Sequence, residues 1–296
     1  NKSWAQFGLG VLYGRGLGVK EDPKRACELL KLAADQGHHH AQFNLGIRYA
    51  KGEGVNQSDE LSFKYFKLSA DQGYAEAQYN VGAYYQYGKG VEQSDTEAFT
   101  FYILAADQGH REAQFDVGNM YNKGRGVNQS DELSFKYSKL AAEAGHAAAQ
   151  FLVGFCYADG AGVKQSDTEA FKYQKLAADQ GHHLAQRYLG TMYEHGGLGL
   201  IQSDILSSKF YKLAAEAGDA EAQSYLGNYY AKGTGVEQSF AKARDWWTKA
   251  AKQGQEDAIK FLRIMMAFCS KCNKPAQTNR TLRKCKCKGA QYCNNT

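Results

Sequence analysis

Small and apolar residues return along this chain at a fixed spacing. An Ala-Gln pair is followed by a branched apolar residue, a glycine and, three residues later, a tyrosine. The step between successive pairs is 36 residues five times and 37 residues once. The pairs begin at Ala5, Ala41, Ala77, Ala113, Ala149, Ala185 and Ala222. A period of this size indicates a solenoid, in which each unit buries its apolar face against its neighbours.

Within one unit the spacing predicts a first helix. Ala41, Leu45 and Tyr49 lie at positions i, i+4 and i+8, on one face of a helix. A glycine such as Gly46 weakens an isolated helix by about 1 kcal/mol. Its return in every unit therefore predicts that a neighbouring helix passes too close for a side chain. The loop that follows, residues 51–55, contains two glycines suited to positive φ.

A second helix follows in each unit. It begins after a serine such as Ser58, and in units three and five the sequence Ser-Asp-Thr-Glu fits a capping box. It ends at a glycine such as Gly73, which is typical of a helix C-terminus. Its expected buried face consists of Ser62, Tyr65, Phe66, Ser69 and Ala70. Residues 54–65 and 126–137 are identical, which indicates that a pair of units was duplicated. The sequence thus predicts an all-α chain of seven two-helix units.

The pattern Ala-Gln-x-x-Leu-Gly-x-x-Tyr-x-x-Gly-x-Gly-Val, with a second helix ending Ala-Ala-x-x-Gly, resembles the Sel-1-like repeat, a relative of the tetratricopeptide repeat. The resemblance covers residues 1–255. It implies a right-handed superhelical α/α solenoid that serves as an adaptor or scaffold in protein complexes. Unit seven is atypical, with Trp246 and Trp247 in place of the usual Tyr/Phe pair. Residues 256–268 are therefore expected to form a terminal capping helix.

Comparison of the units with one another separates packing positions from variable ones. Ala41, Gln42, Gly46 and Tyr49 have counterparts in every unit, whereas two positions on another face of the first helix differ. In solenoids of this kind the first helix lines the concave side, so we expect the variable stripe to line a partner-binding groove. Unconstrained solvent-facing positions would vary in the same way. The stripe consists of Asn44, Arg48, Asn80, Tyr84, Asp116, Met120, Tyr188, Met192, Tyr225 and Tyr229.

Histidines and two cysteines of the repeats are expected to have structural roles. The histidines follow the glycine that ends the second helix, so those of different units lie too far apart to share an ion with ligand distances of about 2 Å. They are His38, His39, His40, His110, His146, His182 and His183. Cys27 and Cys156 stand singly beside apolar neighbours and are expected to be buried. The absence of cysteine pairs within the units indicates a reducing compartment.

The end of the chain has a different composition. From Ala258 onward there are nine Lys or Arg and no Asp or Glu, whereas the preceding residues carry 27 basic and 31 acidic side chains. Five cysteines lie here among few apolar residues, so zinc or disulfides must organise the segment. An odd number of cysteines and a Cys-x2-Cys spacing favour zinc over disulfides. The cysteines are Cys269, Cys272, Cys285, Cys287 and Cys293.

Residues 269–296 resemble the front half of a MYND-type zinc finger, with Cys-x-Cys where that family more often has Cys-x2-Cys. The resemblance implies two zinc ions with interleaved ligands in the complete finger. Cys269, Cys272 and Cys293 would share one ion, and Cys285 and Cys287 the other, with three further ligands expected beyond Thr296. Neither site is complete within the chain, so we expect this segment to bind zinc loosely and to be mobile.

These features predict a non-enzymatic adaptor that binds one protein on the solenoid and a second through the finger. We expect a monomer in the cytoplasm or nucleus of a eukaryotic cell. The basic tail would offset zinc-bound thiolates rather than bind nucleic acid, and no stretch approaches the ~20 apolar residues that cross a bilayer.

The alternatives are an adaptor in endoplasmic reticulum quality control, the regulatory part of a MYND-containing enzyme and a secreted β-lactam-binding repeat protein. Because Asn1 lies inside a repeat, we expect a fragment of a longer protein.

Overall fold

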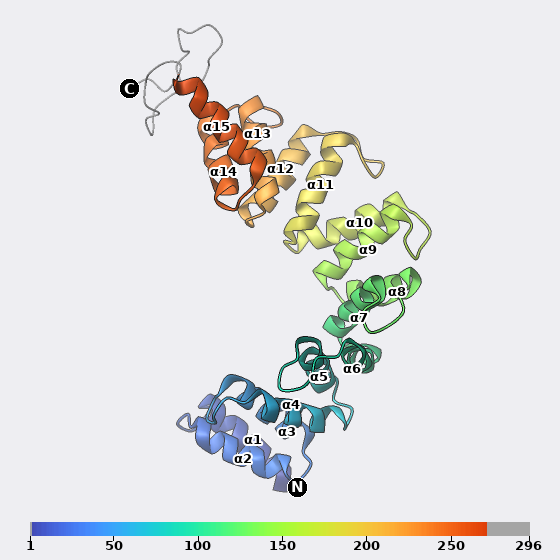
Figure 1. Cartoon of the computed structure of the whole chain (residues 1–296), viewed down its shortest axis with the longest axis vertical. Helices are drawn as coiled ribbons and strands as arrows, with labels where there is room; N and C mark the ends of the chain where they lie inside the picture. The colour runs from blue at the N-terminus through green and yellow to red at the C-terminus, as the bar shows by residue number, and fades with distance from the viewer. Residues whose placement is uncertain (1, 271–296) are drawn as a thin grey trace. The chain divides into compact units, whose positions relative to one another are not determined.

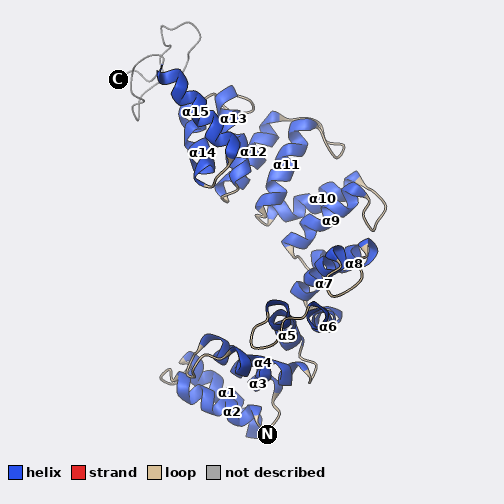
Figure 2. Ribbon diagram, viewed as in Figure 1, coloured by secondary structure: helices blue, strands red, loops and turns tan. Residues whose placement is uncertain are grey.

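Fifteen α-helices follow one another along the part of the chain that the structure describes. The computed structural model describes residues 2–270, and side chains as far as Met265. No strand occurs in residues 2–270 (Figure 2), so the all-α prediction is confirmed there. The helices, labelled in Figure 1, are α1 (Lys2–Arg15), α2 (Pro23–Ala34), α3 (His39–Lys51), α4 (Asp59–Ala70), α5 (Ala75–Tyr87), α6 (Asp95–Asp107), α7 (Arg111–Lys123), α8 (Asp131–Glu143), α9 (Ala147–Asp159), α10 (Asp167–Asp179), α11 (His183–His195), α12 (Asp204–Glu216), α13 (Ala220–Lys232), α14 (Phe240–Lys252) and α15 (Glu256–Ser270).

The chain divides into two compact units, called unit 1 and unit 2 below. The recurring units of the sequence are called repeats from here on. Unit 1 is Asn1–Ala149 with Ala161–Val163, and unit 2 is Gln150–Gly160 with Lys164–Thr296. Each repeat contributes a first helix (odd-numbered, α1 to α13) and a second helix (even-numbered, α2 to α14). Within a unit, the second helix packs against both its own first helix and the first helix of the next repeat. This is the solenoid arrangement that the period predicts.

Serine side chains start the second helices. In six of them the hydroxyl oxygen accepts a hydrogen bond from a backbone N–H of the first turn, which satisfies one of the donors left free at a helix start. The confirmed capping serines are Ser58, Ser94, Ser130, Ser166, Ser203 and Ser239. The predicted buried face of the second helix is also confirmed in α4, where all five of its expected residues are buried.

The glycine inside each first helix lies where the second helix of the same repeat crosses it. A Cβ added at Gly118 would lie 2.4 Å from the Ser138 hydroxyl oxygen and 3.2 Å from the Ser134 carbonyl oxygen. At Gly46, a Cβ would instead meet the Phe66 ring at 2.7 Å. The prediction that this glycine permits a close helix approach is therefore confirmed.

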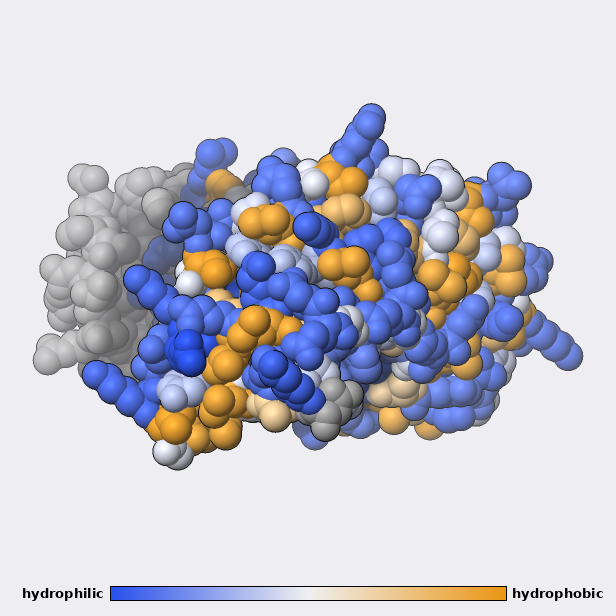
Figure 3. All heavy atoms as spheres, turned by 90° about the horizontal axis from the view of Figure 1, so that it is seen from below, coloured by the Kyte–Doolittle hydropathy of each residue, from blue (hydrophilic) through white to orange (hydrophobic). Residues whose placement is uncertain are grey.

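Small buried residues form the core of each repeat. The alanine of each Ala-Gln pair from Ala41 to Ala222 is completely buried. Cys27 and Cys156 are buried too, as expected, and the Cys27 thiol donates to the Glu53 carbonyl oxygen at 3.2 Å. On the face drawn in Figure 3, apolar side chains form small groups separated by hydrophilic ones. The apolar surface is thus used mainly for packing between helices.

The glutamine of the Ala-Gln pair is a buried polar residue with a defined partner. The Gln42 side-chain amide donates to the Ala34 carbonyl oxygen at 3.2 Å, and Gln78 donates to Ala70 in the same way. The accepting carbonyl lies in the last turn of the preceding second helix, where no helical N–H is available to it. Gln114, Gln186 and Gln223 repeat the bond. The glutamine therefore links each first helix to the end of the helix before it.

The last helix extends beyond its predicted end. α15 covers Glu256–Ser270 rather than 256–268, so it includes the backbone of Cys269. The predicted boundary between the terminal helix and the zinc segment thus falls inside a helix. Ala258 is fully buried near Trp247, whose ring stacks on Phe261 with centroids 5.1 Å apart. These contacts attach α15 to the seventh repeat.

Candidate functional site

The predicted stripe occupies two positions of the first helix that differ in exposure. One position, three residues after the recurring alanine, holds Asn44, Asn80, Asp116, Tyr188 and Tyr225. All of these are partly or well exposed. The other position, four residues further on, holds Arg48, Tyr84, Met120, Met192 and Tyr229. The two rows therefore have to be described separately.

The second row is mainly a packing row. Tyr84, Met120 and Tyr229 are only 8%, 5% and 5% exposed, so their side chains are not accessible to a partner. The Tyr84 hydroxyl lies 2.7 Å from the Ser62 hydroxyl, and the Tyr229 hydroxyl lies 2.8 Å from that of Ser207. The expectation that these three residues line a groove is corrected, because each tyrosine inserts between helices and bonds a buried serine.

Arg48 in the same row is also engaged within the chain. Its guanidinium donates to the Gly14 carbonyl oxygen at 3.4 Å and lies 3.1 Å from a carboxylate oxygen of Glu53. Only 15% of its side chain is exposed. Met192 is half-buried. Both residues contribute at most an edge to an accessible surface.

The first row is accessible, but its chemistry changes along the chain. Asn44 and Asn80 donate to the carbonyl oxygens of His40 and Glu76 in their own helices, at 2.8 and 2.7 Å. Asp116 accepts a hydrogen bond from the Tyr79 hydroxyl, and burial raises the pKa of its carboxyl group. The polar members of the row, all in unit 1, therefore have partners within the chain.

In unit 2 the first row is aromatic on α11 and α13, whereas α9 has Leu152 at this position. Tyr188 contacts Phe155 edge to face, with ring centroids 4.6 Å apart. Tyr225 stacks on Tyr211 at 5.0 Å and is 40% exposed. Exposed tyrosine supplies a large contact area at a low cost in side-chain entropy. These rings are the part of the predicted stripe best suited to contact another molecule.

The repeated histidines cap helices, a role that the sequence analysis missed. In His38, His110, His146 and His182 the imidazole Nδ1 accepts a hydrogen bond from the backbone N–H of the alanine three residues later. Asp219 occupies the same position in the seventh repeat and caps α13 in the same way. The presence of this aspartate, a common N-cap residue, was the signal that could have revealed the role.

Each capping ring also contacts the first helix of the preceding repeat. His110 stacks on Tyr79 and His146 stacks on Phe115, both with centroids 4.5 Å apart. Where Arg187 replaces the aromatic residue, Asp219 replaces the histidine, and the guanidinium lies 3.3 Å from the carboxylate. At this junction the two positions change together, whereas Tyr74 stands at the histidine position opposite Phe43 without a capping hydrogen bond.

The described side chains, residues 2–265, do not form a metal-binding cluster. No group of three or more His, Cys, Asp or Glu side chains is arranged there to hold a metal ion. Several tyrosines have a raised pKa because they are buried, as for Tyr229, whose pKa is about 12. The predicted zinc ligands, and their predicted mobility, lie outside the residues whose side chains are described. Those ligands are Cys269, Cys272, Cys285, Cys287 and Cys293.

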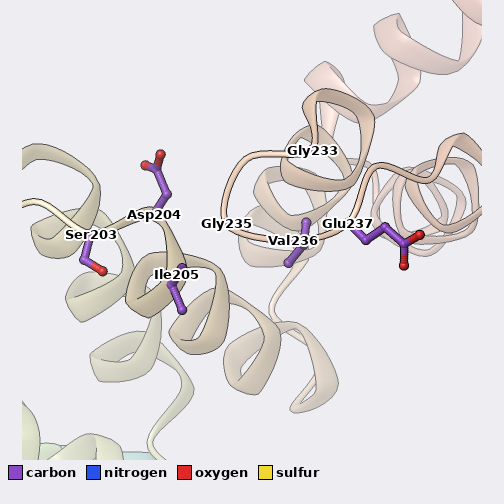
Figure 4. A pocket seen from close by; sticks show the side chains of 7 residues that line it. All are labelled: Ser203, Asp204, Ile205, Gly233, Gly235, Val236 and Glu237. Atoms are coloured by element: carbon purple, nitrogen blue, oxygen red, sulfur yellow. The ribbon is translucent and has the colours of Figure 1, made fainter.

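A shallow depression lies where the loop of the seventh repeat meets the start of α12 (Figure 4). A Cβ added at Gly235 would lie 2.1 Å from the Asp204 carbonyl oxygen, and Gly235 has a φ of 63°, so glycine is required there. The carboxylates of Asp204 and Glu237 point away from each other in Figure 4. The depression is therefore a packing seam between repeats, without converging reactive groups.

Comparison with known proteins agrees with the architecture. The family model for the Sel1 repeat matches residues 5–38, 39–74, 75–110, 111–146, 147–182, 183–219 and 220–255. A protective antigen of uropathogenic Escherichia coli strains with an SLR fold is 32% identical, with a TM-score of 0.82 over 86% of this chain. A Sel1 repeat protein from Oxalobacter formigenes is 34% identical, with a TM-score of 0.77 over 89% of this chain.

The chain spans 55% of the length of the first of these structures and 76% of the second. No curated protein matches the chain. Among the described helices, none combines the length and the apolar character that crossing a membrane requires.

Proposed function

Because the chain belongs to the Sel1 repeat family, whose repeats generally mediate protein–protein interaction, we propose that it is a non-enzymatic adaptor that binds a partner protein on its first helices. The single observation that supports this role is the accessible row of first-helix residues. Its members change along the chain, from asparagine on α3 and α5 through Asp116 on α7 to tyrosine on α11 and α13, whereas the buried alanine, glutamine and glycine beside it do not. Variable side chains on a uniform scaffold are what recognition of a particular partner requires.

The proposed surface is smaller than the sequence alone suggested. It consists of the accessible first row, Asn44, Asn80, Asp116, Tyr188 and Tyr225, without the buried Tyr84, Met120 and Tyr229. Tyr188 and Tyr225 are its expected energetic centre, because exposed aromatic residues dominate many protein interfaces. Arg48 and Met192 are its expected edge.

Site-specific photo-crosslinking tests this assignment. A photoreactive phenylalanine analogue is introduced at Tyr225 on a first helix, and separately at Lys64 and Lys136 on second helices. We expect a specific crosslinked partner from position 225 only. Crosslinking of the same partner from the two lysine positions, and not from position 225, would place the binding surface on the second helices.

A zinc finger is the second proposed element of the adaptor. We propose that Cys269, Cys272, Cys285, Cys287 and Cys293 are zinc ligands and that the folded finger binds a second protein. The support is the donor set itself, since thiolates at Cys-x2-Cys spacing are typical of structural zinc sites. Zinc would supply the cross-links that a segment with few apolar residues needs in order to fold.

The proposed setting is the cytoplasm or nucleus, with the protein acting as a monomer. Cys27 and Cys156 are buried, unbridged thiols, which suit a reducing compartment. Fractionation of cells expressing a tagged full-length protein tests the location, and light scattering of the purified chain tests the monomeric state. Recovery in the secretory pathway would instead support the endoplasmic reticulum alternative.

A further inference from the structure

Two first helices of unit 2 carry a carboxylate near their C-terminal ends, whereas α13 of the same unit ends with Lys232. In unit 1, α1, α3 and α7 end with Arg15, Lys51 and Lys123. In unit 2, α9 ends with the exposed Asp159, and α11 carries Glu194 next to its last residue. A helix C-terminus bears partial negative charge, which favours cations and disfavours carboxylates. Asp159 and Glu194 are therefore placed where they do not help their own helices.

The same part of unit 2 carries aromatic residues that are at least partly exposed. Phe155 on α9 touches Tyr188 on α11, and Tyr225 follows on α13. The Arg187 guanidinium on α11 pairs with Glu221 on α13, which shows that these two first helices are neighbours. In this way the rings and the carboxylates lie on consecutive first helices of one compact unit.

The carboxylates act electrostatically on the rings. The pKa of the Tyr188 hydroxyl is raised, first by burial and then by the negative charges of Asp159 and Asp167. The pKa of the Tyr225 hydroxyl is also raised, by burial and by the negative charges of Glu221 and Glu194. Arg187 opposes this effect at Tyr225, but its guanidinium is already shared between Asp219 and Glu221. Most of the charges that act on the two tyrosines are therefore negative.

Two of these carboxylates are not neutralised by a cation. Within the described residues, no ion pair involves Asp159 or Glu194, and the nearby Arg187 pairs with Asp219 and Glu221 instead. Glu194 accepts a hydrogen bond of 2.7 Å from the Tyr211 hydroxyl, which fixes its position beside the ring that supports Tyr225. A carboxylate held next to an aromatic face is suited to a guanidinium or ammonium group, which is attracted to both.

We propose that the first helices α9, α11 and α13 form a docking surface for a basic, arginine- or lysine-containing segment of a partner protein. The surface rests on the proposed adaptor function and specifies the chemistry of its partner. The rings would contact the flat or aliphatic parts of the basic side chains, while Asp159 and Glu194 bind their charges. An acidic segment would be repelled. Unit 1 lacks this combination, because Asn44 and Asn80 stand at the ring positions and Lys51 at the position of Asp159.

Three labelled peptides of equal length test the proposal. They carry arginine, glutamine or glutamate at the same alternate positions, and their binding to the full chain is measured by fluorescence anisotropy at two salt concentrations. We expect the arginine peptide to bind at least tenfold more tightly than the other two, with an affinity that falls as salt rises. Asp159→Lys should weaken its binding about tenfold without lowering the melting temperature, because lysine is the residue at this position in unit 1.

Further variants separate the rings from the charges. Tyr188→Leu and Tyr225→Leu keep apolar volume but remove the aromatic face, and each should weaken the arginine peptide several-fold. Lys51→Asp in unit 1 is the matched control and should leave binding unchanged. Equal binding of the glutamate peptide, or unchanged binding by Asp159→Lys, would overturn the proposal. If position 225 still crosslinks to a partner in that case, the adaptor function stands and only the basic chemistry of its partner is wrong.

Discussion

The side-chain amide of Gln108 donates a hydrogen bond of 2.7 Å to the amide oxygen of Gln78, thirty residues earlier in the same repeat. Gln72 bonds Gln42 in the same way, and Gln180 bonds Gln150. Alanine replaces the donor in two repeats, at Ala144 and Ala217. The acceptors that would face these alanines, the side-chain oxygens of Gln114 and Gln186, are buried without a partner among the described residues.

Ala144→Gln should therefore stabilise the chain. The new amide would donate to the buried Gln114 side-chain oxygen, which has no hydrogen-bond partner in the parent chain. The free energy of unfolding should rise by about 1 kcal/mol, less a few tenths because glutamine has a lower helix propensity than alanine. We expect a higher urea midpoint, and the same for Ala217→Gln at Gln186. Gln108→Ala is the reverse change. It should lower the free energy of unfolding by about 1–2 kcal/mol, because it leaves the Gln78 side-chain oxygen without a hydrogen bond. Equal midpoints for Ala144→Gln and the parent chain would show that the unpaired oxygen carries no penalty.

Gly118→Leu should destabilise the chain by about 3 kcal/mol or more. Backbone and side-chain atoms of α8 lie within 3.2 Å of the position that a Cβ would take, so the helices must separate. Gly8→Leu is the matched control, since Gly8 lies in the first helix α1 with no atom within 4 Å of its Cβ position. That variant should be unchanged or slightly stabilised by its higher helix propensity. Thermal unfolding of both variants decides between a crossing constraint and a general effect of leucine.

Stability should fall as the pH drops below about 6.5, the ordinary pKa of histidine. Burial lowers the pKa of His38 and of His146 in the folded chain, so the neutral ring is favoured there. The stabilisation is present above the unfolded pKa and is lost as the pH falls from about 6.5 toward the lower folded pKa. A protonated ring would also be unable to accept the capping hydrogen bond at Nδ1.

His146→Asp provides the check on this pH dependence. Aspartate caps the corresponding helix at Asp219. The ordinary pKa of an aspartate side chain, about 4, lies well below that of histidine. We expect the variant to lose less stability than the parent chain between pH 7 and pH 5, measured by urea unfolding at each pH. A parallel loss in both proteins would assign the pH dependence to other groups.

Zinc content tests the proposed finger. With three thiolates for one ion and two for the other, the chain should hold at most one zinc ion, and loosely. Titration against a chromophoric chelator measures this affinity, and Cys272→Ser should reduce it further. Helical circular dichroism of the repeats should not change when zinc is removed. Two tightly held ions, or none at excess zinc, would contradict the assignment to a MYND-type finger.

Residues that are buried at the same position of every repeat could be predicted from the sequence, because burial on one helix face keeps the same residue types at a regular spacing. Ala41, Leu45 and Gly46 were placed correctly for this reason. Tyr84 and Tyr229 were misplaced, because variation was taken to mean exposure. Their burial depends on a serine of the previous second helix that accepts or donates to the hydroxyl, a contact between residues 22 apart that periodicity does not show.

The residue opposite each crossing glycine also determines which helices can pair during folding. The segments that lead into α4 and α8 are identical through Tyr65 and Tyr137, and they first differ at Phe66 and Ser138. At Gly46 the Phe66 ring fills the crossing, whereas at Gly118 the α8 backbone itself comes within 3.2 Å. If α4 docked on α7, the Phe66 ring would have no room beside Gly118. If α8 docked on α3, the small Ser138 side chain would leave a void beside Gly46. We therefore expect this one side chain to disfavour exchange of the two duplicated helices during folding.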